Sequence, residues 1–175
     1  PADVVSETTF PTTTPHETLS AVTDYFKQVV KKTGINLRAV GIASFGPLDL
    51  NPDSDTYGFI THTPKLGWKM TDVAGNIARG LDLPVFIDTD VNGAAMGEYL
   101  WGAGRGLDNL VYLTVGTGIG GGAVIDGRPI HGLVHPEMGH IRIQHDWAAD
   151  PYKGCCPFHG DCLEGLASGP AIEGR

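Results

Sequence analysis

The sequence has few cysteines, no long apolar run and little positive charge, and each shortage excludes a class of protein. Its 175 residues include three cysteines close together, at Cys155, Cys156 and Cys162, so an extracellular disulfide framework is not expected. No window approaches the roughly 20 apolar residues that a membrane span needs. The first residues also lack the basic and apolar segments of a secretory signal. We therefore expect a cytoplasmic protein without a membrane partner.

Charge and glycine content further limit the function classes that fit this sequence. Lys and Arg number 12 against 20 Asp and Glu, which gives a formal net charge of -8. Nucleic-acid binding needs clustered Lys and Arg to neutralise phosphates, and the sequence has no such cluster, so we expect no nucleic-acid partner. Glycine is abundant, with 25 residues in the whole chain, and most of them lie between Gly93 and Gly174. Glycine lets a backbone approach a ligand closely, so this region is a candidate binding region.

Helix and strand patterns alternate along the first hundred residues, which is typical of an α/β fold. A capping box formed by Thr14 and Glu17 begins one helix, and Gly34 follows its end. Apolar spacing predicts the other elements. The predicted strands are 39–44 and 84–88, and the further predicted helices are 71–81 and the segment that follows Asp90.

The pattern changes after Gly106. Strands are predicted at 110–115 and 122–125, followed by a hairpin turn at Asp126-Gly127 and a final helix from Leu163. The glycine-rich segment 102–106 is interpreted as a linker. We therefore expect two domains, residues 1–105 and 106–175.

A glycine-rich loop, Gly116 to Gly122, follows the predicted strand 110–115. It satisfies the dinucleotide-binding pattern G-x-G-x-x-G, but that pattern requires a helix immediately afterwards, and here a strand follows. A hairpin whose backbone N–H groups hold phosphates remains, with the Thr117 hydroxyl as a further donor. The alternative is a tight turn without a ligand.

Four possible metal ligands follow the pattern H-x15-C-x2-H-x2-C: His140, Cys156, His159 and Cys162. Two thiolates and two imidazoles make a closed tetrahedral set that favours zinc. Cys155 is an alternative ligand at a less suitable spacing, and the other possibility is cysteines unrelated to the histidines. We expect the remaining histidines at the surface or in loops: His16, His62, His131, His135 and His145.

Three carboxylates occupy positions where chemistry is possible. Asp90 stands between a predicted strand and a predicted helix, so it can be a proton acceptor or a helix N-cap. Glu137 lies three residues before His140, and Glu164 lies two residues after Cys162. A metal ion held by those ligands would aim both glutamates at the hydroxyls of a ligand. The alternative is that both are surface glutamates.

Several stretches together resemble the ROK family of sugar kinases and repressors. They are Gly46–Asp49, Thr63–Trp68, Asp88–Glu98, Leu113–Gly121, Glu137–His140 and Cys162–Glu164. The resemblance covers nearly the whole chain. It implies the α/β, two-domain, actin-like ATPase (RNase H-like) fold, present here as a partial chain, with a sugar in the cleft. It also implies a phosphate loop before Pro1 and helices after Arg175, and it leaves open whether Ile172–Arg175 is native helix or a protease-site scar.

The resemblance assigns roles to individual residues. Asp90 would be the general base that activates a sugar hydroxyl toward Mg²⁺-ATP. The implied phosphate-binding residues are Gly116, Thr117 and Gly118, and the implied sugar-binding residues are Gly46, Pro64, Lys65, Gly67, Thr89, Glu137, His140 and Glu164. One structural Zn²⁺ per chain would be bound by His140, Cys156, His159 and Cys162. The family also implies a homodimer.

Variant positions within the resemblance favour fructose as the sugar. Thr89, Lys65 and the Cys-x2-His-x2-Cys spacing resemble the fructokinases of the family, which form fructose 6-phosphate, and differ from its glucose kinases. The alternatives are a kinase for glucose, mannose or N-acetylmannosamine, or a sugar-sensing repressor. A repressor would carry an N-terminal helix-turn-helix, and none is visible in the sequence.

Overall fold

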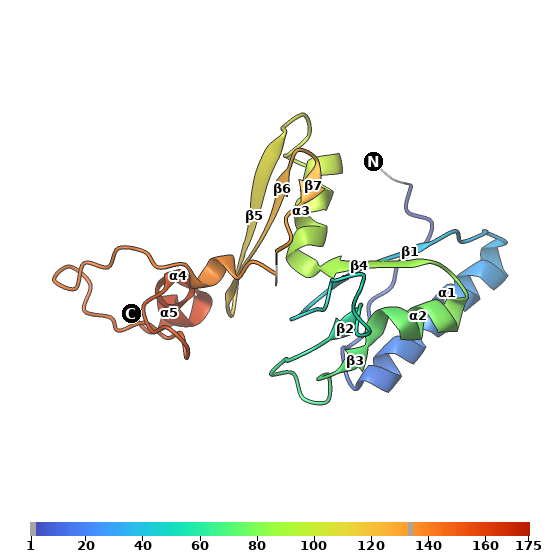
Figure 1. The fold of residues 1–175 in the computed structure, drawn as a ribbon, viewed down its shortest axis with the longest axis horizontal. Coiled ribbons are helices and arrows are strands. Elements are labelled where there is room, and N and C mark those ends of the chain that lie inside the picture. Colours follow the sequence, from blue (N-terminus) through green and yellow to red (C-terminus); the bar gives the residue numbers. More distant parts are fainter. Residues whose placement is uncertain (1–2, 133–134) are drawn as a thin grey trace. The chain divides into compact units, whose positions relative to one another are not determined.

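The computed structural model describes residues 3–132 and 135–175, and the chain divides into two compact units, Pro1–Asp90 and Val91–Arg175 (Figure 1). The predicted boundary at residue 105 lies one helix further along the chain. The helix α3 (Asp90–Trp101) groups with the second unit because its start packs against the strand β6 (Ile119–Ile125). A Cβ at Gly122 of β6 would collide with the Val91 carbonyl, so glycine permits this close approach.

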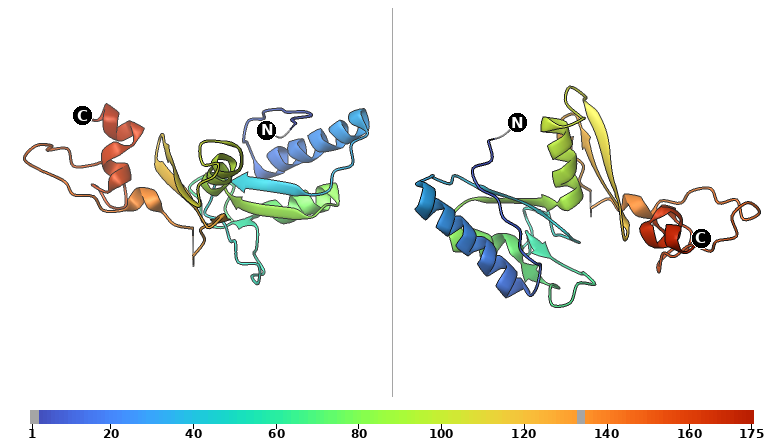
Figure 2. Two further views of the ribbon diagram at one scale, coloured as in Figure 1. Left: turned by 90° about the horizontal axis from the view of Figure 1, so that it is seen from above. Right: turned by 180° about the vertical axis from the view of Figure 1, so that it is seen from behind.

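Two helices lie side by side in the first unit (Figure 2). The helix α1 (Pro15–Thr33) begins with the predicted capping box and ends at Gly34, whose φ of 70° is left-handed, so both predicted signals are confirmed. The helix α2 (Val73–Leu81) packs against α1 through Gly80. A Cβ at Gly80 would lie 2.9 Å from the side chain of Thr23.

Two small sheets complete the first unit. The strands β1 (Val40–Ser44) and β4 (Val85–Thr89) pair in parallel, and β2 (Phe59–Ile60) pairs antiparallel with β3 (Thr71–Asp72). The observed helix α2 therefore starts two residues later than the predicted helix 71–81. Asp72 ends β3 and caps α2, because its carboxylate accepts a hydrogen bond from the Gly75 N–H at 2.7 Å.

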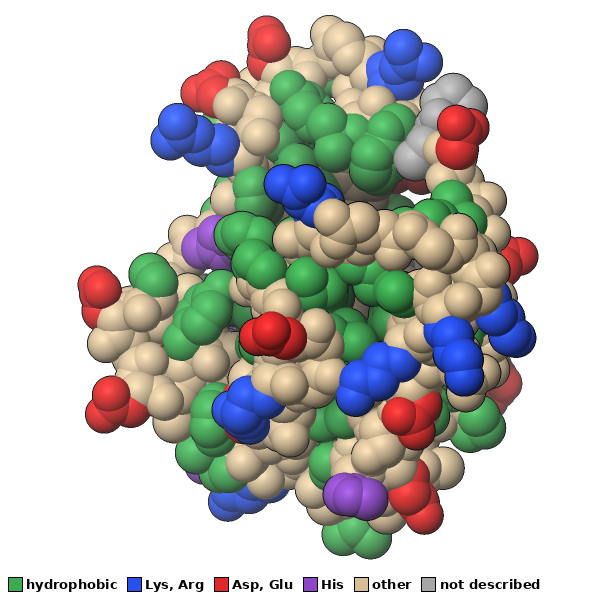
Figure 3. Space-filling model, turned by 90° about the vertical axis from the view of Figure 1, so that its right-hand side faces the viewer, with side chains coloured by type: hydrophobic (Ala, Val, Ile, Leu, Met, Phe, Trp, Pro, Cys, Tyr) green, Lys and Arg blue, Asp and Glu red, His purple; other side chains and the backbone are tan. Residues whose placement is uncertain are grey.

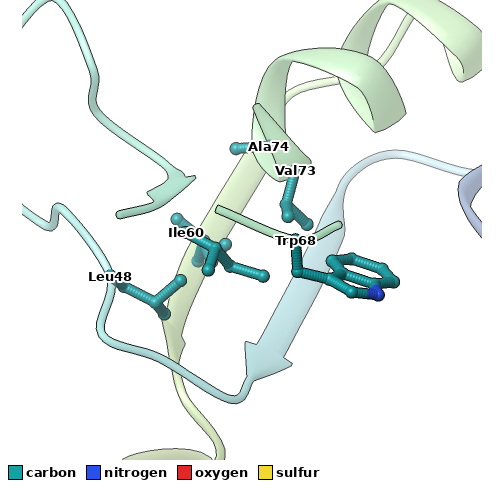
Figure 4. Close-up of a cluster of buried hydrophobic side chains, with 6 residues drawn as sticks. Leu48, Ile60, Trp68, Val73 and Ala74 are labelled. Carbon is teal, nitrogen blue, oxygen red and sulfur yellow. The ribbon is translucent and has the colours of Figure 1, made fainter. Parts of the chain in front are cut away.

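The core of the first unit gathers side chains from separate elements. Leu48, Ile60 and Val73 point toward one another, with Trp68 alongside (Figure 4). Ile60 is fully buried, and burial of such a side chain contributes about 1.5–3 kcal/mol. The Trp68 indole N–H donates to the Thr13 carbonyl at 2.8 Å, so this core also holds the segment before α1.

An antiparallel sheet forms the centre of the second unit. The strand β5 (Asn109–Val115) pairs with β6, and β6 pairs with β7 (Arg128–Pro129). Asp126 and Gly127 connect β6 to β7 with φ angles of 48° and 74°, as a tight hairpin turn requires, so the predicted turn is confirmed. The helix α3 lies along this sheet (Figure 1).

The end of the second unit consists of short elements. They are the 3-10 helix η1 (Met138–His140), α4 (Leu163–Ala167) and α5 (Gly169–Glu173). Among the described residues, no helix has the length and apolar character that crossing a membrane requires. On the face drawn in Figure 3, Lys and Arg side chains are interspersed with Asp and Glu.

Candidate active site and metal centre

The carboxyl ends of β1 and β4 form one edge of the parallel sheet. Ser44 pairs with Thr89, so Phe45 and Asp90 follow at the same edge. Asp90 is the first residue of α3 and is exposed, whereas Thr89 is only 3% exposed. Ligands bind at this edge of parallel sheets, and an exposed carboxylate there can accept a proton. Asp90 therefore lies at the sheet edge where the sequence predicted it, and its role as a base stays a prediction.

Lys65 extends over an aromatic pair near this edge. Its Nζ lies 4.7 Å from the centre of the Phe45 ring and 6.0 Å from that of Trp68. The two rings meet edge to face at 5.2 Å. Because Phe45 directly follows β1, a cation–π contact holds the ammonium group at the carboxyl end of the sheet.

The other predicted sugar-binding residues of the first unit lie in loops beside these side chains. Gly46 follows Phe45 and begins a cis peptide bond to Pro47. Pro64 and Gly67 flank Lys65 in the turn that ends at Trp68, and Gly67 has a left-handed φ of 81°. That turn closes with a hydrogen bond from the Trp68 N–H to the Lys65 carbonyl at 3.2 Å.

The glycine-rich loop is a β5–β6 hairpin, as predicted, but its turn is shorter than the glycine run. Only residues 116–118 form the turn, and β6 begins at Ile119. Gly116 and Thr117 are exposed, but the Gly116 N–H donates to the Gly118 carbonyl at 2.9 Å, so Thr117 is the residue that offers an N–H and a hydroxyl to a phosphate. The later glycines serve packing instead: a Cβ at Gly121 would lie 2.7 Å from the sulfur of Met138.

Two contacts hold this turn from outside the hairpin. The Ile119 N–H donates to Glu164 Oε2 at 2.9 Å, and the Gly169 N–H donates to the Gly116 carbonyl at 2.7 Å. Both partners come from the short helices α4 and α5. The second predicted glutamate, Glu137, is exposed and immediately precedes η1.

The four predicted metal ligands come together. His140 Nδ1 lies 3.6 Å from the sulfurs of both Cys156 and Cys162, and His159 Nδ1 lies 3.9 Å from the Cys156 sulfur. All four ligand atoms lie within 4.8 Å of one another. Around a tetrahedral zinc ion, a sulfur and a nitrogen ligand are about 3.5 Å apart, as bond lengths of 2.3 and 2.0 Å require. The donor set therefore fits zinc in chemistry and in spacing.

The neighbouring Cys155 is not part of the metal-ligand cluster. The Cys155 sulfur faces the Ser168 hydroxyl at 3.6 Å and is outside the ligand cluster. Cys162, in contrast, is 1% exposed, and burial raises the pKa of its thiol. A bound metal ion would oppose that effect because it favours the thiolate.

One buried cluster could not be identified from the sequence. His145 lies in a loop, as expected, but its side chain is only 5% exposed and stacks on Trp147 with ring centres 4.0 Å apart. Its Nδ1 lies 3.5 Å from an Asp161 oxygen, and its Nε2 lies 3.0 Å from the Asp150 carbonyl. No spacing pattern signals this histidine, because its partners are brought together only by the folded loop.

The C-terminal Arg175 is also part of this fold. Its guanidinium contacts Asp150 Oδ2 at 2.7 and 3.1 Å and lies 4.8 Å from the centre of the Tyr152 ring. The hydrogen bonds from Arg175 hold the pKa of Asp150 below its usual value. These contacts tie the end of the chain to the loop that carries His145.

Superposition on a solved ROK hexokinase shows that the chain has the α/β, actin-like fold of ROK sugar kinases, of which it spans a portion. The chain belongs to the ROK family, whose family model matches residues 2–175.

Within this family, the chain is similar to several sugar kinases. The chain is 54% identical to a fructokinase from Zymomonas mobilis, covering 94% of this chain and 55% of that protein. It is 50% identical to a putative fructokinase from Bacillus subtilis, covering 98% and 55%. A ROK hexokinase from Thermus thermophilus superposes with a TM-score of 0.76 at 30% identity, covering 93% and 52%. The chain thus spans about half the length of the relatives it matches.

Proposed function

We propose that the protein carrying this chain is an ATP-dependent fructokinase that converts D-fructose to fructose 6-phosphate. The observation that carries the proposal is the 54% identity to a fructokinase over 94% of the chain. The exposed Asp90 at the sheet edge and the glycine hairpin support it, because they offer a proton acceptor and phosphate-binding N–H groups.

The proposed reaction is a phosphoryl transfer from Mg²⁺-ATP. The Asp90 carboxylate accepts the proton of the C6 hydroxyl as that oxygen attacks the γ-phosphorus. The new O–P bond forms, the bond to the leaving ADP breaks, and the proton remains on Asp90. Gly116, Thr117 and Gly118 bind ATP phosphates, and the magnesium ion that accompanies ATP neutralises charge. Catalysis then consists mainly of positioning and electrostatic stabilisation.

The other predicted residues would hold the sugar. The Glu137 and Glu164 carboxylates accept hydrogen bonds from its hydroxyls, the His140 ring forms another hydrogen bond with it, and Lys65 donates through its ammonium group. His140 is suited to two tasks, because its Nδ1 faces both cysteine sulfurs and its Nε2 is then the ring nitrogen for the sugar. The loop residues beside Lys65 and the buried end of β4 complete this set: Gly46, Pro64, Gly67 and Thr89.

We further propose that one Zn²⁺ per chain is structural. His140, Cys156, His159 and Cys162 supply four ligands, which closes a tetrahedral shell and leaves no position for substrate. Zinc would therefore stabilise the segments that carry Glu137 and Glu164. The enzyme would act in the cytoplasm as a homodimer on small molecules, without a nucleic-acid or membrane partner.

A coupled ADP-release assay on the full-length protein tests the function. We expect turnover with fructose to exceed that with glucose, mannose and N-acetylmannosamine. Asp90→Asn should lower kcat by about 10²–10⁴-fold, since general-base catalysis contributes that much. Turnover of glucose without fructose would overturn the substrate, and near-full activity of Asp90→Asn would overturn the mechanism.

A further inference from the structure

The turn of the glycine hairpin is held by the segment that follows the metal ligands. Cys162 is the residue before α4, and Glu164 lies in the first turn of that helix. Its carboxylate accepts the Ile119 N–H at 2.9 Å, where β6 begins. Residues 119 and 164 are 45 positions apart in sequence, so this hydrogen bond joins two separate parts of the second unit.

The start of β6 is also enclosed by η1, and Glu164 itself lies close against the turn. A Cβ at Gly139 of η1 would collide with the Ile119 carbonyl, so the segment carrying His140 packs directly on the start of β6. A Cβ at Gly118 would lie 2.6 Å from Glu164 Oε2, which shows how closely the carboxylate approaches the turn. The hairpin turn therefore depends on side chains and backbone next to the metal centre.

We propose that Glu164 is a positioning residue for the phosphate-binding turn, in addition to its predicted contact with the sugar; this inference rests on the proposed function. One carboxylate oxygen fixes the Ile119 N–H, and the second is the one suited to a sugar hydroxyl. A turn of Gly-Thr-Gly has large backbone freedom, which must be lost when phosphates bind. Glu164 reduces that loss because it holds the turn in place beforehand.

The carboxylate also places negative charge beside the turn, which opposes phosphate binding. Two neutral variants separate this charge from the positioning role. In Glu164→Gln the amide oxygen can still accept the Ile119 N–H, whereas Glu164→Ala removes the acceptor. The comparison between these two variants therefore reports positioning alone, because neither carries the charge.

The first test is amide hydrogen exchange at Ile119 in the full-length protein without ligands. We expect exchange about fivefold to tenfold faster in Glu164→Ala than in the wild type, and near wild-type exchange in Glu164→Gln. Glu173→Ala, a substitution at an exposed glutamate of α5, is the matched control and should leave Ile119 unchanged. Unchanged Ile119 exchange in Glu164→Ala would overturn the proposal.

The second test measures the Kd of a non-hydrolysable ATP analogue with Mg²⁺, without sugar, by calorimetry. We expect Glu164→Ala to bind about fivefold more weakly than Glu164→Gln, because only the second variant keeps the turn in place. Equal Kd values for the two variants would overturn the proposal. A wild type that binds no nucleotide would refute the kinase function instead, and the exchange experiment would still decide whether Glu164 holds the turn.

Discussion

Replacing one predicted metal ligand tests the proposed zinc site, and replacing a neighbouring cysteine that is not a ligand provides the control. Cys162→Ser removes a sulfur that lies 3.6 Å from His140 Nδ1, so three ligands remain from the four. Cys155→Ser is the matched control, because the Cys155 sulfur faces Ser168 and is outside the cluster. We expect about one zinc per chain in the wild type and in the control, and far less in Cys162→Ser.

The size of the effect follows from the number of ligands. Loss of an outer-shell partner alone weakens metal binding by 10–100-fold, so loss of a direct ligand should weaken it by at least about 100-fold. At a fixed free zinc concentration, a 100-fold change in affinity removes about 2.7 kcal/mol of stabilisation. For a chain of this size each kcal/mol shifts Tm by about 2–4 °C, which gives a decrease of roughly 5–10 °C.

Elemental analysis of the purified proteins measures zinc content, and thermal unfolding measures Tm. A Cys162→Ser protein that keeps a full zinc ion while Cys155→Ser loses it would show that the wrong cysteine is assigned. Zinc absent from all three proteins after growth and dialysis with zinc would refute the metal centre itself.

Three other predictions concern single side chains. Lys65→Met should raise KM for fructose about tenfold with little change in kcat, and the KM of Lys65→Arg should lie between those of Lys65→Met and the wild type. A Lys65→Met KM equal to that of the wild type would show that Lys65 does not bind the sugar. The Ser54 and Thr56 hydroxyls hold the pKa of Asp49 below its usual value, so its contribution to stability is present above about pH 4 and is lost at lower pH. The free energy of unfolding, measured with urea from pH 7 to 3, should therefore fall less steeply for Asp49→Asn than for the wild type. Parallel curves for the two proteins would contradict this. Gly122→Ala should cost about 1–3 kcal/mol in urea unfolding because the new Cβ meets backbone, and a wild-type midpoint would show that the packing is looser.

Local elements of the fold could be predicted because their signals lie within a few residues. The capping box at Thr14 and the left-handed residue Gly34 mark both ends of α1, and the Asp126-Gly127 pair marks the β6–β7 turn. The helix expected at 71–81 was too long, because residues 71 and 72 pair with β2. That pairing depends on a partner strand about ten residues away, which a helical apolar pattern does not report.

The metal set could also be predicted, because three of its four ligands lie within seven residues and its donor types admit few metals. The glycine run indicated a phosphate hairpin, but the run alone could not separate the turn at 116–118 from glycines that pack inside β6. That distinction requires knowing which atoms lie opposite each glycine. The Val91 carbonyl and the Met138 side chain provide it only in the folded unit.

The sequence by itself determined the α/β class, the group of four possible metal ligands and the family, because apolar periodicity, ligand spacing and local motifs are written in consecutive residues. Tertiary structure decided which groups meet. The parallel register of β1 and β4 brings Phe45 and Asp90 to one edge, and the packing of α4 brings Glu164 to Ile119. Contacts between distant residues depend on how whole elements pack, and no short stretch of sequence specifies that packing.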